Sequence, residues 1–536
     1  MLEQLSRMEL ESLKFPRLYV DYVMSKVPPT FEAPTLFGTG TTEDVAPPSG
    51  VDRESLWNDV LEYNSRLGAS ESSLDNIRAL ALGEAVPVLT GQQPGLFGGP
   101  LYTLYKVLTA ASLSERPVRE GTRRFVPVLW NASDDSDFEE VSSASFFDGE
   151  LSRKTFSMSG AYHSQGRMVG SVPTEAVNEP FGALLRSLVE SSDATAARRL
   201  IEDSLRPAGD LGEFFSALFL RIASASGIVV VDARLPSVSK CSRDVLGAYL
   251  KKATSVEREV VASLKALTDV GYSKPVSASS AEVCVFLKEG EIRKKVSPDE
   301  LSRVGELWEK GEAELVPNVL LGPILRNELL GVAASVLGPS EVGYTFVTSA
   351  VSRVLGFRQT PVFPRLSMTV FPRSLTVLVE SGAKRPEDVI LAFDEAASDY
   401  VLRRVPENVE KELARFTGQV RSAMDTASEL ASASGRSTED VTASARRKID
   451  FELQRVRDAF LSVYRKRALA ETPVLRQGRE FLSPKGTLQE RIFCCLAPLV
   501  YSGESFVSDA QEVARTHVRE CLEGRVHHYV TVADIP

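Results

Sequence analysis

The stretch VPVLTGQQPGLFGGPLYTLYK, residues 86–106, decides the fold of this chain. Its apolar start, residues 86–89, is typical of a buried parallel strand. Four glycines follow between positions 91 and 99, and glycine lets the backbone approach a ligand closely. Pro100 then suits the first position of a helix, where a missing N–H costs nothing. A strand, a glycine-rich loop and a helix N-terminus in this order predict an anion-binding site.

The helix that follows Pro100 places Tyr102 and Lys106 one turn apart on one face. Side chains lean toward the N-terminus of their helix, so Lys106 should point back at the loop. The motif lacks the Gly-Lys-Ser/Thr ending of a Walker loop and the GxGxxG spacing of a dinucleotide site. The alternative is a tight strand-to-helix turn with a solvated lysine. The binding interpretation assigns this region to an anionic ligand, through Gly91, Gln92, Gln93, Gly98, Gly99, Tyr102 and Lys106.

Further apolar strands are predicted at residues 125–130 and 228–231, and helical stretches at 179–205 and 211–226. Strands that alternate with helices favour an α/β fold with a doubly wound parallel core. Ligands in such sheets bind beyond the carboxyl ends of the strands. Gly91 and Asp134 both follow their strands directly, so we expect them to face the same site.

A cluster of acids follows the second strand: residues 134–140 read DDSDFEE. Carboxylates this close repel one another, which raises their pKa values or requires a cationic partner. They could bind a substrate ammonium, hold Mg²⁺ or act as a general base. The alternative is a solvated helix N-terminus, where acids are favoured. The candidate catalytic residues are Asp134, Asp135 and Asp137.

Segment 400–470 has a different pattern, with apolar residues at alternating steps of four and three. Such heptads predict two packed helices, and the small polar stretch at 431–438 predicts a turn between them, giving an antiparallel hairpin. The hairpin serves either dimerisation or packing on the body of the protein. We therefore expect a core with inserted segments at 1–385, a coiled-coil hairpin at 386–475, and a returning segment at 476–536.

The 536 residues carry a net charge of −10, which argues against a global nucleic-acid footprint. No apolar run is long enough to span a membrane, and the first residues lack a signal-peptide core. Five cysteines without metal-ligand spacing fit reduced thiols in the cytoplasm. The four histidines all lie outside the glycine-rich region, so we expect neither a zinc site nor a histidine-dependent triad.

Several short polar insertions occur at apolar boundaries, at 317–320, 338–344, 362–367 and 483–491. Each is either ordinary turn chemistry or part of a binding site, and the Lys-Gly turn of the last offers donors to phosphate. The residues that could contact a ligand from these segments are Asn318, Glu341, Tyr344, Arg365, Ser367, Lys485, Gly486, Gln489 and Arg491.

Together these motifs resemble the bacillithiol biosynthesis cysteine-adding enzymes, the BshC family. The resemblance is carried by TGQQPGLFGGPLYTLYK at 90–106, VPVLWNASDDSDFEEV at 126–141, PNVLLGPIL at 317–325, GPSEVGY at 338–344, PVFPRLS at 361–367 and PKGTLQER at 484–491. It implies a Rossmann-like core related to class I aminoacyl-tRNA synthetases and other nucleotidylyltransferases, and a coiled-coil arm that forms a homodimer. It also implies a ligase that joins cysteine to glucosaminyl-malate through an amide bond, with ATP and Mg²⁺ as the hypothesised means of activating the carboxylate.

Two positions depart from the family pattern. The family usually has Glu-Asp-His-Asp after the second strand, and this chain has Ser136 in place of the histidine. The family also tends to carry arginine where this chain has Gly322, and Arg326 lies one helical turn later if that segment is helical. These differences leave two alternatives open: a related ligase with another amino acid or amine acceptor, or an inactive dimeric binding homologue.

Overall fold

The computed structural model describes residues 5–28, 33–38, 52–116, 123–188, 191–382, 385–433 and 439–535. They form two compact units. The first contains the chain up to Asp148 together with Arg153–Val370 and Thr487–Ile535, and the second is built mainly from Phe371–Gly486. The helical unit therefore extends beyond the range 386–475 at both ends, because short helices before and after the long hairpin pack on one another.

A five-stranded parallel sheet forms the centre of the first unit. In sheet order β11-β10-β2-β3-β6, its strands are Val362–Pro364, Ala334–Leu337, Ala85–Gln92, Arg124–Asn131 and Val229–Asp232. The chain lays β3 and β6 on one side of β2, and β10 and β11 on the other. The winding therefore reverses between β2 and β10, which is the place where open α/β sheets bind their ligands.

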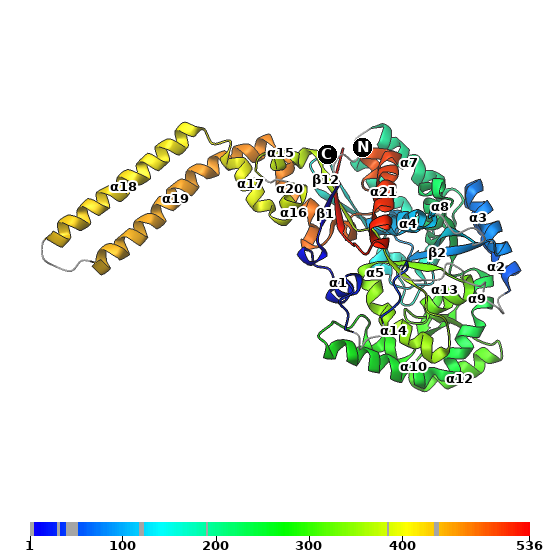
Figure 1. Cartoon of the computed structure of the whole chain (residues 1–536). Coiled ribbons are helices and arrows are strands. Elements are labelled where there is room, and N and C mark those ends of the chain that lie inside the picture. The colour runs from blue at the N-terminus through cyan, green and yellow to red at the C-terminus, as the bar shows by residue number, and fades with distance from the viewer. Residues whose placement is uncertain are drawn as a thin grey trace. The chain divides into compact units, whose positions relative to one another are not determined.

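Helices cover both faces of this sheet (Figure 1), as the alternation of side chains along each strand requires. One apolar cluster joins Leu89, Val128 and Val231 to α2 (Arg53–Arg66), α3 (Glu71–Leu82), α13 (Gly322–Leu330) and α14 (Pro339–Leu355). The other joins Val88 and Val336 to α4 (Leu101–Ser114) and α21 (Leu499–Leu522). This confirms the predicted parallel core with helices on both faces.

Smaller sheets surround the core. An antiparallel sheet of order β8-β7-β9 (Ile292–Lys295, Val285–Glu289, Glu314–Pro317) lies in the insertion that also holds α10 (Arg243–Asp269), α11 (Ala278–Glu282) and α12 (Pro298–Glu309). A second sheet has the order β1-β13-β12 (Leu5–Met8, His528–Ala533, Met368–Pro372). The strands β4 (Ser143–Phe147) and β5 (Arg153–Ser157) pair with each other, and the remaining helices of this unit include α1 (Arg17–Val23), α5 (Phe138–Val141) and α9 (Pro236–Cys241).

The predicted helices at 179–205 and 211–226 are each interrupted. The first is two helices, α6 (Glu175–Ser187) and α7 (Ser192–Leu205), because Ser191 starts a new helix by accepting a hydrogen bond from the Ala194 N–H at 3.0 Å. The second is α8 (Leu211–Ile222) followed by a short 3₁₀ turn. Hydrophobic periodicity alone does not reveal a serine that caps a new helix, so it predicts one continuous helix where there are two.

The second unit contains α15 (Thr376–Glu380), α16 (Pro386–Leu391), α17 (Phe393–Leu402), α18 (Glu407–Ala433), α19 (Glu439–Glu471) and α20 (Val474–Leu482). The long helices α18 and α19 lie side by side (Figure 1). Arg421 is paired with Asp450 at 2.9 Å, and Asp425 with Arg446, which fixes an antiparallel register. Most of the turn predicted at 431–438 lies outside the described residues.

None of the helices that the structure describes is both long and apolar enough to span a bilayer.

Candidate functional site

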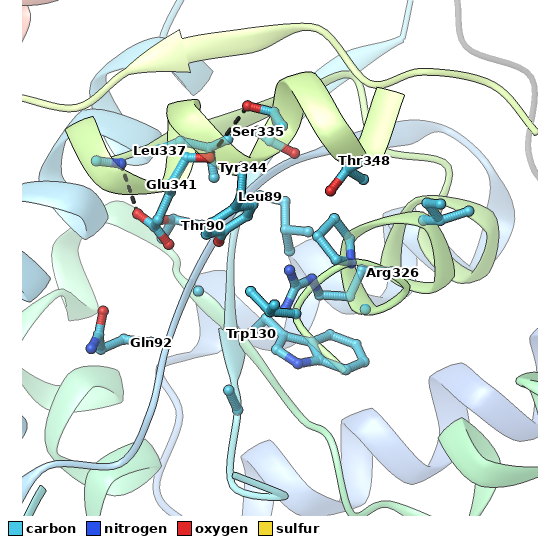
Figure 2. A pocket seen from close by; sticks show the side chains of 18 of the residues that line it. Leu89, Thr90, Gln92, Trp130, Arg326, Ser335, Leu337, Glu341, Tyr344 and Thr348 are labelled. Carbon is cyan, nitrogen blue, oxygen red and sulfur yellow. Dashed lines mark hydrogen bonds between the residues drawn. The ribbon is translucent and has the colours of Figure 1, made fainter. Parts of the chain in front are cut away.

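A cavity of about 500 Å³ opens at the carboxyl edge of the parallel sheet. The end of β2, residues 89–92, and the end of β10, at Ser335 and Leu337, form its floor. Helices α4, α13 and α14 supply its walls, and Figure 2 shows how Trp130, Arg326, Tyr344 and Thr348 surround it. The cavity therefore lies where the winding of the sheet reverses, as predicted for a ligand site.

The glycine-rich loop and the acidic segment face each other across this cavity. The Gln93 amide donates to Asp135 Oδ2 at 2.9 Å and to Glu140 Oε2 at 3.2 Å. The backbone of the two strand ends is also joined, because the Ala132 N–H donates to the Gln92 carbonyl at 2.9 Å. Gly91, Gln92, Asp134 and Asp135 all line the cavity, so the two motifs build one site.

Lys106 points back to the loop, as the leaning of helical side chains requires. Its ammonium donates to the Gly91 carbonyl at 2.9 Å and to Gln92 Oε1 at 3.0 Å, and it pairs with Glu341 at 2.7 Å. Burial lowers the pKa of Lys106, and the adjacent carboxylate of Glu341 opposes that effect. Tyr102 lies beside it, with the ammonium 5.6 Å from the ring centroid. The lysine is thus a buried part of the site rather than a solvated side chain.

Two of the three candidate catalytic acids have structural partners. Asp137 is exposed and accepts a hydrogen bond from the Glu140 N–H at 3.1 Å as the N-cap of α5. This residue therefore has the role of the alternative interpretation, a solvated acid at the N-terminus of a helix. Asp135 accepts the Ser136 N–H at 2.6 Å in addition to the Gln93 amide, and it pairs with Arg293. Both oxygens of Asp135 are therefore occupied, and it anchors the acidic segment.

Asp134 differs from its neighbours. It lines the cavity and is partly buried, and no other described side chain donates a hydrogen bond to it. Burial raises its pKa to about 6, against the opposing charge of Arg293 and with a further upward contribution from Asp135. A carboxylate with a pKa near the working pH is suited to accept and release a proton.

The structure gives Gly98 and Gly99 a packing role instead of the predicted ligand contact. Both are buried and have positive φ angles of 87° and 72°, and neither lines the cavity. A Cβ on Gly98 would lie 2.3 Å from Cys495 Sγ. The first N–H of α4, at Leu101, donates to the Phe493 carbonyl at 2.7 Å, and Pro100 is the N-cap rather than the first helical residue. That N–H is therefore already bonded to the protein.

The predicted residues of segments 317–320 and 338–344 all line the cavity. The Asn318 amide donates to the Ser280 carbonyl at 2.9 Å, and its oxygen accepts the Leu320 N–H at 2.9 Å, so it holds the turn before α13. Glu341 accepts the Gly338 N–H at 2.7 Å at the start of α14 while it pairs with Lys106. Tyr344 is partly buried in the cavity wall.

Several residues of the last two motifs are held by one buried carboxylate, Glu490. Arg365 pairs with Glu490 at 2.6 Å, and Ser367 donates to it at 3.0 Å. Gln489 instead bonds the backbone of Val370 through both of its amide atoms, at 2.9 and 3.1 Å. Arg365 still lines the cavity, whereas Ser367 and Gln489 do not. These polar residues mainly fix the C-terminal segment to the core.

The two ends of segment 483–491 fall in different units. Arg491 is exposed and lines the cavity. Lys485 and Gly486 belong to the helical unit, where both have positive φ angles and the Lys485 N–H donates to the Glu480 carboxylate at 3.3 Å.

The sequence reasoning missed Arg293, which reaches the cavity from β8 in the inserted sheet. It donates to Ser136 Oγ at 2.9 Å and pairs with Asp135, and its guanidinium lies 4.5 Å from the centroid of the Phe286 ring. Ser136, at the position where the family pattern has histidine, therefore binds this arginine. Arg293 sits on an ordinary hairpin more than a hundred residues from the acids, so no local signal marks it.

Within the part of the chain that the structure describes, no three His, Cys, Asp or Glu side chains are grouped so as to hold a metal ion.

Comparison with known proteins agrees with the Rossmann-like fold. Residues 39–366 match the family described as "Bacillithiol biosynthesis BshC, N-terminal Rossmann-like domain". The chain belongs to the BshC family. A BshC relative from Bacillus anthracis, named "Putative cysteine ligase BshC", is 22% identical over 531 residues, which cover 94% of this chain and 97% of the relative. A relative of the same name from Bacillus cereus (strain AH187) is 23% identical over 427 residues, covering 75% of this chain and 79% of the relative.

Proposed function

We propose that this BshC-family protein is a ligase that joins the carboxyl group of cysteine to the amine of glucosaminyl-malate. Support comes from the name of its relatives, cysteine ligase, and from one feature of the cavity. That feature is Asp134. No other described side chain donates a hydrogen bond to its carboxylate, and its pKa is about 6. The site thus contains a base where amide formation needs one.

Amide formation requires a base because the acceptor amine is protonated near neutral pH and must lose a proton to attack. In the proposed reaction Asp134 takes one proton from the ammonium, the freed amine nitrogen bonds to the activated cysteinyl carbon, and the leaving group departs with the second proton of the nitrogen. Asp134 is ionised in most molecules above pH 6 and so is ready to accept the first proton. Asp135, fixed by Gln93 and Arg293, adds negative charge that attracts the ammonium form of the acceptor.

The activation step is supported by chemistry, because a free carboxylate is a poor acyl donor. ATP with Mg²⁺ is the proposed activator, in line with the relation to class I synthetases and nucleotidylyltransferases that the family resemblance implies. The glycine-rich loop contributes little to phosphate binding, since the Leu101 N–H is bonded to Phe493 and Lys106 is neutralised by Glu341. The cations available to phosphates at the cavity are Arg326 and the exposed Arg491.

A second candidate keeps the reaction and changes the acceptor. Ser136 holds Arg293 beside the acids, and Gly322 leaves space at the start of α13, where a Cβ would meet only Pro317, at 4.0 Å. Both positions line or border the cavity, so both alter the shape that an acceptor meets. A different amino sugar or a different amino acid would suit such a site.

We also propose that the hairpin α18–α19 forms a homodimer. Several of its large apolar side chains remain exposed in the single chain: Phe416, Leu430, Phe451, Phe460 and Val463, with exposed fractions of 47%, 71%, 64%, 52% and 63%. An exposed apolar seam on paired helices is the usual signature of a partner helix.

A turnover assay tests the proposed ligase. The purified protein is incubated with ATP, MgCl₂, L-cysteine and glucosaminyl-malate, and the amide is sought by mass spectrometry. Omission of ATP tests the activation step, and replacement of the acceptor by glucosamine or other amines tests the second candidate. Product formation by the wild type but not by Asp134→Asn would support the proposal. Binding of substrates without any product would instead indicate an inactive binding homologue.

A further inference from the structure

Arg326 lines the cavity without an ion-pair partner among the described side chains, and the charge of Asp134 acts on it only through space. It projects from α13 into the cavity wall, and its guanidinium carbon lies 5.8 Å from the centroid of the Trp130 ring. Figure 2 shows the two side chains next to each other in the cavity. No carboxylate of the described residues lies within ion-pair distance of Arg326, and none of them accepts a hydrogen bond from it.

The other arginines and the lysine that line the cavity have ion-pair or hydrogen-bond partners or are solvated, although the Arg365 Nε is buried without an acceptor. Lys106 and Arg293 are paired with acids of the site. Arg365 has Glu490 as its partner, Arg358 donates to Asn327 Oδ1 at 2.9 Å and to the Val332 carbonyl, and Arg491 is exposed to water. Arg326 thus stands out from the cations around it.

A guanidinium in a cavity wall that lacks a hydrogen-bonded anion has donors left for a ligand. A second group in the same cavity wall has the same property: the Thr348 hydroxyl is buried, with 5% of the residue exposed, and it has no hydrogen-bond partner. A ligand with an oxyanion would accept hydrogen bonds from the guanidinium and from the Thr348 hydroxyl.

We propose that Arg326, on the Trp130 ring and in the cavity that Thr348 also lines, binds an oxyanion of a substrate, either a carboxylate or a phosphate. This inference rests on the proposed ligase function only in taking the ligand to be a substrate. The planar guanidinium offers two parallel N–H donors, which match the two oxygens of such a group. The Trp130 ring attracts the guanidinium by a cation–π interaction and so helps to hold it in the cavity wall.

Titration calorimetry with wild type, Arg326→Gln and Arg326→Lys tests the subsite. The probes are L-malate, inorganic phosphate, L-cysteine and cysteamine, which is cysteine without its carboxylate. Arg353→Gln is the matched control, since it removes a half-exposed arginine at the end of α14 that does not line the cavity. Thermal unfolding of each variant verifies that the fold is retained.

We expect the affinity for at least one oxyanion probe to fall about 10- to 100-fold in Arg326→Gln, with a smaller loss in Arg326→Lys and none in the control. The probe that loses affinity identifies the source: malate for the acceptor, cysteine but not cysteamine for the amino acid, phosphate for the nucleotide. Cysteamine affinity should not change.

A transfer of the arginine along α13 provides a second test. Gly322 precedes Arg326 by four residues and also lines the cavity, so side chains at both positions project from one face of the helix. The double variant Gly322→Arg/Arg326→Gln should regain part of the lost affinity. This recovery would not occur if Arg326 served only the fold.

Unchanged affinities for every probe in Arg326→Gln would overturn the inference, as would a wild-type protein that binds none of the oxyanions. The outcome is separable from that of the ligase assay. Loss of anion binding in a protein that makes no amide would uphold the subsite and reject the ligase. An Arg326→Gln protein with wild-type turnover and affinities would reject the subsite alone.

Discussion

Lys106 and Glu341 form an ion pair of 2.7 Å that joins helices from opposite faces of the parallel sheet. Lys106 lies on α4 and Glu341 in the first turn of α14, so the pair passes over the carboxyl end of β2. The lysine side chain is 4% exposed and that of the glutamate 23%. The pair closes one side of the cavity and holds the glycine-rich loop through the contacts of Lys106 with Gly91 and Gln92.

Glu341→Gln should strongly destabilise the protein. It leaves the Lys106 ammonium buried without a counter-charge, and the loss of one partner of a buried pair costs about 3–5 kcal/mol. Urea denaturation should show a lower midpoint with an unchanged slope. The double variant Lys106→Met/Glu341→Gln should be less destabilised than Glu341→Gln alone, because no unpaired charge remains. If Glu341→Gln unfolds at the same urea concentration as the wild type, the ion pair does not stabilise the fold.

The rate of amide formation should fall below about pH 6. Asp134 must be ionised to accept a proton, and its pKa is about 6, so kcat/KM should decrease tenfold per pH unit on the acid side. Asp134→Asn should lower kcat roughly 100-fold or more at pH 7.5, the usual contribution of a general base. Asp137→Asn is the control, because it removes a charge while the amide oxygen still caps α5, and it should retain activity. An acid limb that persists in Asp134→Asn would exclude Asp134 as the base.

The same carboxyl group should make stability depend on pH. The pKa of Asp134 is higher in the folded protein than its ordinary value of 3.8, so the folded state holds this proton more tightly than the unfolded state does. Ionisation therefore destabilises the fold as the pH rises from about 4 to 6, and the full penalty is present above 6. Asp134→Asn should be more stable than the wild type at pH 7.5, and the difference should shrink toward pH 4. A difference independent of pH would contradict this linkage.

Two glycines of the loop should respond differently to alanine. Gly98→Ala should cost about 2–4 kcal/mol, because Gly98 has φ of 87° and its Cβ would lie 2.3 Å from Cys495 Sγ. Gly91→Ala should leave the melting temperature nearly unchanged, since its Cβ would meet Trp130 at an ordinary 3.4 Å. It should nevertheless weaken ligand binding, because Gly91 lines the cavity. Equal destabilisation by both changes would disprove this division of roles.

Charge on the exposed seam of the hairpin should separate a dimer. Phe460→Glu and Val463→Glu place carboxylates where we propose helix contacts, and light scattering should report a change from dimer to monomer. Arg457→Glu, an exposed polar position of the same helix, controls for added negative charge. A wild-type protein that is monomeric at micromolar concentration, or variants that remain dimeric, would argue against the seam.

Much of the core followed from local patterns. The strands predicted at 125–130 and 228–231 coincide with β3 and β6 to within one residue, and the strand predicted at 86–89 lies within β2, which continues to Gln92. A buried parallel strand is apolar on both faces and is therefore visible in a short window. The long helices α18 and α19 follow from heptads in the same way. The division of the helix predicted at 179–205 into α6 and α7 was missed, since the start of α7 depends on a capping serine, Ser191, inside a helical pattern.

The sequence by itself determined the strand, loop and helix of residues 86–106 and the acids at 134–140, because hydrophobic periodicity and chain order act over short distances. Only the tertiary structure decided which polar residues remain available to a ligand. Arg293 and Gln93 occupy Asp135, and Glu490 engages Arg365 and Ser367. Asp134 and Arg326 are left without such partners. Pairing between residues that are far apart in the sequence depends on the path of the chain in space, which composition and spacing do not encode.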